Sequence, residues 1–326
     1  MPDGLIALTG WQAGLETTRG TLVAATRIQP MTATMRYIID RYAPQEDRNS
    51  FEDFYRSAQT KAHVEINGAV AWATFEDAPW FAQLFVKGGV SGVLSNTTVY
   101  TYTFVPTPAA DDLKTATLEG FTDTAAWAVP FTVGKKLEVT YQRGQPVQFN
   151  MDFWGQRMVS QAKTPALSQR PTEDITDGLT TAYIDTATIG TTVAANVLDG
   201  KLTLDNAWEP IYPLNGTQYP SKFIRNRRHI VGEVTIEFDT TTEYDAFVAG
   251  TARKMRLKSV GTTIAGSSPA TPKSMTWDFY TAGWDTYDFG RQGGIWTAKL
   301  AGRSTYDSTA GSSWSLVCVN DLSTLP

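Results

Sequence analysis

The chain has 326 residues, of which 42% are hydrophobic and 19% are charged, and its formal net charge is −5. This length and apolar content exclude a disordered chain and provide enough residues for two globular domains. The acidic balance argues against tight binding to a nucleic-acid backbone, which requires concentrated Lys and Arg. Abundant Thr, together with 10 Trp, 13 Tyr and 15 Phe, favours β-structure, because these residues suit pleated, half-buried surfaces.

The chain has a single cysteine, Cys318, so no disulfide can form within it. Cys318 lies in an apolar segment near the C-terminus, where we expect a small buried side chain. Residues 1–8 lack the basic region and the long apolar core of a secretory signal. No run approaches eighteen apolar residues, so we expect no membrane-spanning segment and no membrane partner.

In the first half, residues 1–20 are rich in Gly and Thr and are expected to form an arm. Residues 40–62 carry many charges and are expected to form a long polar loop. A short helix is predicted between Pro79 and Gly88, because aromatic and apolar residues follow the proline at helical spacing. Alternating or β-rich segments predict strands at 21–28, 31–39, 63–75, 100–104, 113–119, 137–141 and 147–153.

The second half follows a linker, which its polar composition places at 166–180. A helix is predicted at 242–248, and a second long loop with three prolines is predicted at 206–228. This loop precedes a glycine-containing strand, as the loop at 40–62 does, which indicates a shared contact role. Strands are predicted at 181–189, 201–205, 230–238, 254–260, 274–280, 294–301 and 314–319.

Two intervals of the sequence follow the same pattern, from Gly68 to Gly88 and from Gly232 to Gly250. Each contains an alternating strand, an acidic or Thr-containing turn and a short aromatic helix. Their separation suits a duplicated domain better than a short solenoid repeat. We therefore expect an all-β dominated fold with short helices, built from two tandem β-sandwich or half-barrel domains over 1–165 and 181–326.

Catalytic chemistry is poorly supported by the sequence. The only two histidines, His63 and His229, each precede a strand and are expected to occupy equivalent structural positions. There is no nucleophile elbow, no phosphate-binding or dinucleotide-binding loop and no His or Cys cluster with metal-ligand spacing. Adjacent carboxylates, such as Glu76 and Asp77, are more typical of solvated turns than of a glycosidase. We therefore expect no catalytic residue, no cofactor and no metal.

Four carboxylates, Glu138, Asp152, Glu233 and Glu237, alternate with apolar residues on predicted strands. They line either the solvent side of a sheet or, in a sharper hypothesis, the lumen of a ring. The one basic cluster, residues 225–228, favours a contact with an acidic loop of another subunit. Aromatic residues in Gly- and Thr-rich loops could bind sugar or anchor a subunit interface; they are Trp11, Trp208, Trp284 and Tyr287.

Several motifs, in their order along the chain, resemble the major tail tube proteins of long, non-contractile bacteriophage tails, in the two-domain version. Near the start stands Gly14-Leu15-Glu16-Thr17-Thr18-Arg19-Gly20-Thr21. In the middle stand Tyr100-Thr101-Tyr102-Thr103-Phe104-Val105-Pro106 and Gly134-Lys135-Lys136-Leu137-Glu138-Val139. The second half contributes Leu202-Thr203-Leu204-Asp205-Asn206, the segments 228–238 and 244–250, and the closing Ser315-Leu316-Val317-Cys318-Val319-Asn320.

The resemblance implies a structural virion protein with no enzymatic activity. It implies two packed sheets flanked by a short helix, with inner strands of adjacent subunits joined into a barrel around a channel. Three two-domain chains would give a pseudo-hexameric ring, and stacked rings would let double-stranded DNA pass without specific binding. Tape-measure and tail-terminator proteins are the implied partners, in a virion tail assembled in the host cytoplasm. The acidic balance of the chain fits such a channel.

The residues expected at contacts between subunits lie in the arm and in the two long loops. They are Trp11, Arg41, Asp47, Arg48, Phe54, Tyr55, Trp208, Tyr212, Arg225, Arg227 and Arg228. Two alternatives stay open at this point. One is a two-domain carbohydrate-binding module that uses exposed Trp, and the other is a different head–tail or tail component on the same fold.

Overall fold

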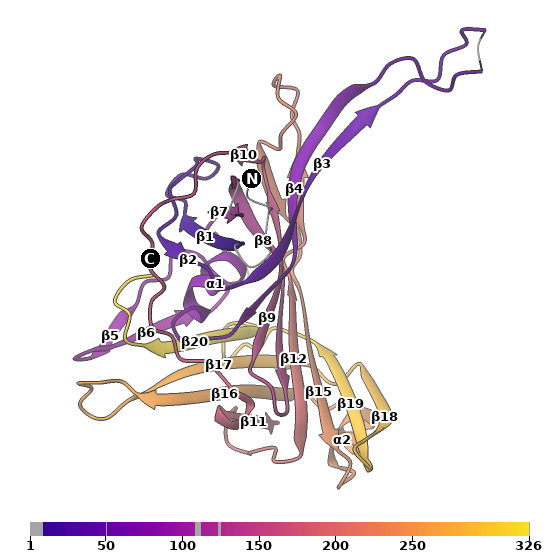
Figure 1. Cartoon of the computed structure of the whole chain (residues 1–326). Helices are drawn as coiled ribbons and strands as arrows, with labels where there is room; N and C mark the ends of the chain where they lie inside the picture. The colour runs from indigo at the N-terminus through magenta and orange to yellow at the C-terminus, as the bar shows by residue number, and fades with distance from the viewer. Residues whose placement is uncertain (1–8, 50, 108–111, 123–124, 326) are drawn as a thin grey trace.

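The structure is a computed structural model that describes residues 9–49, 51–107, 112–122 and 125–325. Antiparallel strands dominate it, with two short α-helices and one 3-10 turn (Figure 1), so the expected all-β fold class is confirmed. The helical elements are α1 (Ala78–Phe85), η2 (Asp177–Leu179) and α2 (Thr242–Ala249). The strands in the first half are β1 (Gly10–Leu15), β2 (Arg27–Ile28), β3 (Thr32–Tyr42), β4 (Ala58–Trp72), β5 (Val93–Asn96), β6 (Val99–Phe104), β7 (Ala116–Phe121), β8 (Ala126–Gln142), β9 (Gln148–Gly155) and β10 (Val159–Ser160). Those in the second half are β11 (Thr180–Asp185), β12 (Val197–Asp205), β13 (Trp208–Ile211), β14 (Lys222–Arg225), β15 (His229–Glu237), β16 (Arg253–Thr263), β17 (Pro272–Thr281), β18 (Thr286–Gln292), β19 (Ile295–Arg303) and β20 (Trp314–Asn320).

One antiparallel sheet runs through both halves of the chain, and we call it the long sheet. Its strand order is β3-β4-β9-β8-β12-β15-β19-β18. The first four strands and the last four form two units with the same connections, since each has a hairpin, a helix after its second strand and a returning hairpin. The two units meet where β8 pairs with β12.

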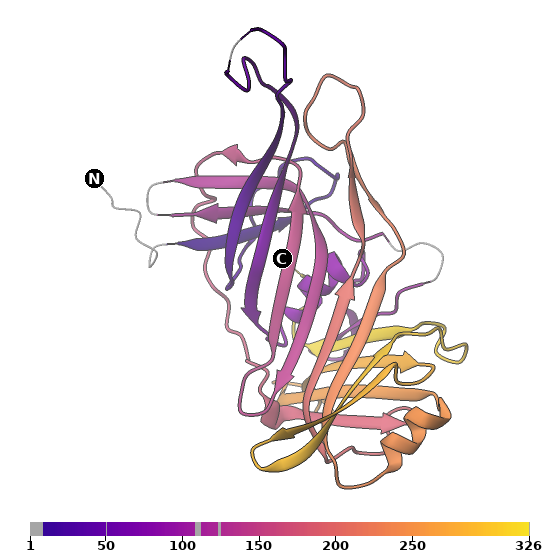
Figure 2. The same cartoon turned by 90° about the vertical axis from the view of Figure 1, so that its right-hand side faces the viewer.

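Two further layers complete the core. A sheet of order β11-β16-β17-β20-β6-β5 lies against the long sheet (Figures 1 and 2). The N-terminal part of β8 leaves the long sheet to pair with β7 and β10. In turn, β7 pairs with β1, and β1 pairs with β2. Hydrogen-bonded sheets thus cross the predicted linker twice, at β8 with β12 and at β20 with β6. The division into 1–165 and 181–326 stays a prediction.

The motif at residues 14–21 forms hydrogen bonds at the place where β8 leaves the long sheet. Glu16 is buried and accepts hydrogen bonds from the backbone of Phe131 at 2.7 Å and from the Thr115 hydroxyl at 2.6 Å. It also accepts one from the backbone of Gly20 at 2.8 Å. Phe131 has a φ of 54°, a conformation that non-glycine residues seldom adopt. The Glu16 carboxylate therefore holds β1, β7 and the bend of β8 together.

The two predicted helices are present and follow β4 and β15. All eight residues of α1 are buried, and its Phe81 and Phe85 pack on Phe149 and Phe153 of β9, with ring centroids 5.7 and 5.1 Å apart. Only Ala246 of α2 is buried. The two helices thus share a place in the chain and differ in their surroundings.

The two predicted long loops are largely hairpins, which corrects the expectation for both. In the first, the strands continue to Tyr42, which pairs with Ala58, so the loop shrinks to residues 43–57. We call β3, β4 and this tip the first hairpin. The strands were missed because a two-stranded ribbon in solvent has no buried face and therefore needs no apolar alternation.

The loop at 206–228 likewise contains β13 and β14, joined by residues 212–221. We call this ribbon the second hairpin. Pro210 lies within β13, a position that an exposed ribbon tolerates. Both hairpins project from the same end of the molecule (Figures 1 and 2).

The expected arm is only partly testable, because residues 1–8 lie outside the described residues. From Gly10 to Leu15 the chain forms β1, which pairs with β7 on one side and β2 on the other. This stretch is therefore an integral strand, and the expectation of an arm over it was wrong.

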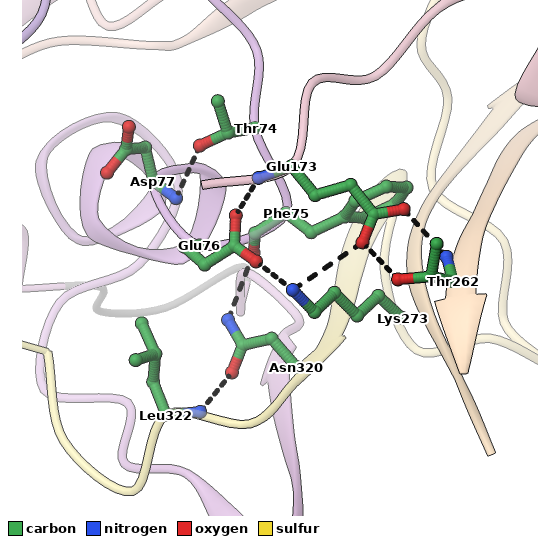
Figure 3. Close-up of polar contacts among 9 residues, drawn as sticks. All are labelled: Thr74, Phe75, Glu76, Asp77, Glu173, Thr262, Lys273, Asn320 and Leu322. Atoms are coloured by element: carbon green, nitrogen blue, oxygen red, sulfur yellow. Dashed lines mark hydrogen bonds and ion pairs between the residues drawn. The ribbon is translucent and has the colours of Figure 1, made fainter. Parts of the chain in front are cut away.

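A partly buried polar cluster joins the segment before α1 to the second half (Figure 3). Lys273 of β17 forms ion pairs with Glu76 and, at 3.5 Å, with Glu173. Glu173 also accepts a hydrogen bond from the backbone of Thr262 at 2.7 Å. Burial works to raise the pKa of Glu173, but the bonds from Thr262 and Lys273 hold that pKa below its usual value. Asn320 of the last strand donates to the carbonyl of Phe75 at 3.0 Å.

Candidate assembly surfaces

The long sheet packs one face on the core and leaves the other face open. The predicted lumen carboxylates all lie on this open face: Glu138 alternates with buried Leu137 and Val139, and Asp152 alternates with buried Met151 and Phe153. On β15, Glu233 and Glu237 alternate with buried Val234 and Ile236. The open face is thus built by the period of two along each strand.

Lysines on the same strand or on a neighbouring strand pair with two of these carboxylates, Glu138 and Glu233. Lys136 lies 2.6 Å and Lys201 lies 3.5 Å from Glu138, and Lys299 lies 2.8 Å from Glu233. The hydrogen bond to Glu138 raises the pKa of Lys136. Partial burial acts to raise the pKa of Glu138, but Lys136 and Lys201 hold it below the usual value. The open face is therefore a mixed surface of paired charges, with more balance than a purely acidic lining.

Asp152 has a structural partner on the same face. Its carboxylate accepts a hydrogen bond from the backbone of Gly68 at 3.1 Å. Gly68 has a φ of 60° and lies where the pairing of β4 with β9 shifts register, so a glycine suits this bulge. Glu237 is exposed at the end of β15.

The two edges of the long sheet are β3 and β18, and each pairs with one neighbour in the described chain. An aromatic cluster lies beside the β18 edge. Tyr287 and Phe289 of β18 have ring centroids 5.1 Å apart, and Tyr244 and Phe247 of α2 lie 5.5 and 5.7 Å from Tyr287. Phe289 is 55% exposed. An unpaired strand edge bordered by exposed aromatic side chains is a surface suited to another chain.

The first hairpin carries five of the residues predicted at contacts between subunits, one at the end of β3 and four at the tip. All five are exposed: Arg41, Asp47, Arg48, Phe54 and Tyr55. Arg48 stacks on the Tyr55 ring at 4.8 Å and pairs with Glu46 at 2.6 Å. The tip thus presents charged and aromatic side chains well beyond the body of the molecule (Figure 1).

Three other predicted contact residues lie in the second hairpin, and two of them, Trp208 and Tyr212, bind it to the first unit of its own chain. The Trp208 indole donates to the carbonyl of Gly134 at 2.9 Å, and Arg225 lies 5.9 Å from the Trp208 ring. The Tyr212 hydroxyl lies 3.1 Å from Nδ1 of His63. Of the basic cluster, Arg227 is exposed and Arg228 donates to the carbonyl of Thr107 at 2.9 Å.

Two of the aromatic residues expected to be exposed are buried, which is a correction. Trp11 is 8% exposed and packs over Gly120, and Trp284 is 5% exposed and donates to Glu243 at 2.9 Å. Trp11 therefore belongs to the core of its own chain, because β1 is an inner strand. The carbohydrate-binding alternative loses two of the rings on which it depended.

The sequence interpretation named Tyr287 as a possible anchor but missed the edge strand β18, because it placed no strand at 286–292. The alternation of Tyr287 and Phe289 with polar neighbours was the available signal. Among the described residues, no cluster of His, Cys, Asp and Glu has the size of a metal site. No helix in the described part of the chain is long and apolar enough to span a membrane.

Residues 8–294 match the family described as phage tail tube protein. The chain belongs to that family. No curated protein matches the sequence. The match confirms the resemblance drawn from the motifs, and it makes this tail tube protein a structural component of a virion tail that assembles with itself into a tube. It also favours the tail tube over other components of the tail.

Proposed function

We propose that this chain is the repeating subunit of a phage tail tube, in which rings surround a channel and stack along the tail. The observation that carries the proposal is the long sheet, with one face on the core, the other face open and an unpaired strand at each edge of the described sheet. Closing such sheets into a ring removes exposed edges that would otherwise favour aggregation. No catalytic step is part of this proposal.

The open face would line the channel. Its carboxylates are interleaved with lysines, as in the pairs of Glu138 with Lys136 and of Glu233 with Lys299. Such a surface offers DNA phosphates no concentrated positive patch, so double-stranded DNA would pass during ejection without stable binding.

We propose three chains in a ring, because the family implies a pseudo-hexameric ring and each chain supplies two four-strand units. Three chains supply six units and would form a pseudo-hexameric ring, with the two units as a duplicated domain. A tape-measure protein would set the tube length and a tail terminator would end it, with assembly in the host cytoplasm. These assignments rest on what the family implies for its members.

The projecting hairpins would connect one ring to the next. They extend from the same end of the molecule, and the tip of the first carries exposed Phe54, Tyr55 and Arg48. Aromatic and Arg side chains are the residue types that most often dominate protein interfaces.

Negative-stain electron microscopy of the purified chain at high concentration tests this function. Hollow tubes with a regular axial repeat are expected, and their rotational symmetry would separate a trimer from a hexamer. A deletion of residues 44–57, closed by a short Asn-Gly turn, should leave a folded, soluble chain that forms no tubes. Normal tubes from this deletion would contradict a role of the first hairpin in stacking.

A circular dichroism spectrum and an unfolding midpoint equal to those of the intact chain serve as the folding control for the deletion. If the intact chain stays monomeric even when preformed tail tips are added as initiators, the tube function itself is wrong.

A further inference from the structure

The long sheet already contains one junction between its two four-strand units, where β8 pairs with β12. There Lys136 lies opposite Asp205, and Glu138 lies opposite Thr203. We propose that β18 of one chain pairs with β3 of the next chain antiparallel and in the register of this internal junction. The proposal rests on the proposed function, because it specifies how the ring closes.

The register follows from matching the two units strand by strand, beginning with the histidines. His63 and His229 occupy the same place on β4 and β15, and their partners are Ile38 on β3 and Asp205 on β12. Position 38 therefore corresponds to position 205. Two residues earlier on each strand, Arg36 corresponds to the Thr203 position.

The returning hairpins match in the same way. Two residues after each histidine, Glu65 pairs with Trp154 of β9, and Val231 pairs with Arg303 of β19. The ends of β9 and β19 thus correspond. This correspondence fixes the positions of β8 and β18, the last strands of the two units, which pair with β9 and β19.

Counting back four residues along β9 and β19 gives Asn150 and Lys299. Their partners are Glu138 on β8 and Asp288 on β18. Asp288 therefore corresponds to Glu138. Since Glu138 lies opposite the Thr203 position in the internal junction, the register places Asp288 of one chain opposite Arg36 of the next.

The side chains agree with this register, although they were not used to obtain it. Arg36 and Asp288 carry opposite charges, both are exposed, and neither forms a salt bridge in the described chain. Opposite charges that face each other across two strands stabilise the pairing, and like charges weaken it.

The other face of the same strands gives a second check. The buried pair Val139 with Leu202 in the internal junction corresponds to Phe289 with Met35 between chains. Phe289 is 55% exposed in the single chain, and Met35 is partly buried at the core. A shift by one residue would bring Asp288 to the apolar face, which a half-buried sheet does not tolerate.

A groove beside β18 gives the third argument. In the first unit, the second hairpin is anchored by Phe223 on Phe131, with ring centroids 5.0 Å apart. The corresponding place in the second unit is a groove of about 500 Å³ lined by His229, Asp285 and Arg303. A neighbouring chain paired in this register would lay the base of its first hairpin over the groove, as the second hairpin lies over the first unit.

Disulfide trapping tests the register in assembled tubes. The pair Arg36→Cys with Asp288→Cys should form a bond between chains on mild oxidation, because residues directly opposite in an antiparallel pair lie within disulfide reach. The matched control pairs Arg36→Cys with Gln292→Cys, four residues further along the same exposed face, about 13 Å away. The native Cys318 is buried and does not compete.

Non-reducing gels should show covalent multimers that end at the size of one closed ring for the first pair, and only monomers for the control. Tubes that cross-link through the control pair, or through neither pair, would overturn the register while the tube function stands. A wild-type chain that forms no tubes even with preformed tail tips would contradict the tube function. In that case, cross-linking of the soluble first pair would still support the edge pairing, and its absence would overturn it.

Charge exchange gives a second readout that does not depend on sulfur chemistry. Arg36→Asp should raise the concentration needed for tube formation about fivefold, since each junction then places two carboxylates opposite each other. Combining it with Asp288→Arg should restore assembly to within about twofold. If the double variant assembles no better than Arg36→Asp alone, these two residues do not face each other.

Discussion

The two helices of this tail tube protein occupy the same place in two units of identical strand order, yet one is buried and the other is exposed. In α1 every residue is buried, whereas in α2 only Ala246 is, and Val248 is 67% exposed. The last strand of the first unit, β8, pairs with β12. The last strand of the second unit, β18, pairs only with β19 in the described chain. The comparison indicates that the first unit encloses its helix within the chain, whereas the second leaves its helix and the β18 edge open to another chain.

The largest difference in unfolding free energy is expected between alanine substitutions at the third residue of each helix. These residues are Trp80 in α1 and Tyr244 in α2. Trp80 is fully buried and Tyr244 is 41% exposed. Trp80→Ala should lower the free energy of unfolding by about 3–5 kcal/mol because it leaves a large cavity. Tyr244→Ala should lower it by less than about 1 kcal/mol. Urea denaturation followed by tryptophan fluorescence or circular dichroism measures both, and equal losses would remove the distinction between the units.

The ion pair between Glu76 and Lys273 should have the next largest effect, because it ties the first unit to the layer behind the second (Figure 3). Replacing either partner leaves a charge in a poorly hydrated place, so Glu76→Gln or Lys273→Met should cost about 2–4 kcal/mol. The double variant should cost less than the sum of the two.

A matched control for this pair is Arg56→Met at the hairpin tip, whose ion pair with Glu46 is exposed. It should change the unfolding free energy by less than about 1 kcal/mol. Thermal unfolding of all four variants supplies the comparison. Additive losses for Glu76→Gln and Lys273→Met would show that the two residues act independently.

A pH dependence is expected from Asp77, which lies at the start of α1 and has no acidic counterpart at Thr241 before α2. Burial opposes its ionisation, but Arg27 and Arg170 hold the pKa of Asp77 below the ordinary value of 3.8. The stabilisation is therefore present above pH 3.8 and is lost as the pH falls through the lower pKa of the folded chain.

Unfolding by urea between pH 5 and pH 2.5 measures this loss, which for one group is at most about 1.4 kcal/mol per pH unit. Asp77→Asn should be less stable at pH 5 and should show a shallower decline than the wild type. Asp47→Asn, at the exposed tip, should follow the wild-type curve. If Asp77→Asn keeps the full slope, other carboxylates cause the acid sensitivity.

The smallest effect on folding is expected for Phe289→Ser at the open edge. The loss should stay below about 1 kcal/mol in the soluble chain, because Phe289 is 55% exposed. At the corresponding buried position of the paired edge, Val139→Ser should cost about 2–4 kcal/mol. Phe289→Ser should nevertheless impair tube formation, which sedimentation measures. Unimpaired sedimentation would mean that the aromatic cluster is not part of the junction.

Prediction from the sequence was accurate where a strand has one buried face and one open face. In β9, the alternation of Phe149, Met151 and Phe153 with polar residues gave both the strand and its inner face. The N-terminal part of β8 was missed, because Ala128 to Val133 is buried on both sides and shows no alternation. The hairpin ribbons and β18 were missed for the opposite reason, since they bury little on either face.

The candidate surfaces divide in the same way. The alternation placed Glu138, Glu233 and their neighbours on an open face, and the structure adds that Lys201 and Lys299 reach them from adjacent strands. Trp11 was mistaken for an exposed anchor because the Gly- and Thr-rich composition around it gave no sign of an inner strand. Strand pairing joins residues far apart in the chain, so local composition does not reveal it.

The sequence by itself determined the all-β class, the positions of both helices and the membership in the phage tail tube family, because these depend on local periodicity and on motifs in a fixed order. Only the tertiary structure decided that the two units share one sheet, and that β3 and β18 are its edges. The physical reason is that the order of strands in a sheet is set by long-range pairing and by which faces must be buried together. The sequence pattern of each strand records the buried face and leaves its neighbours unspecified.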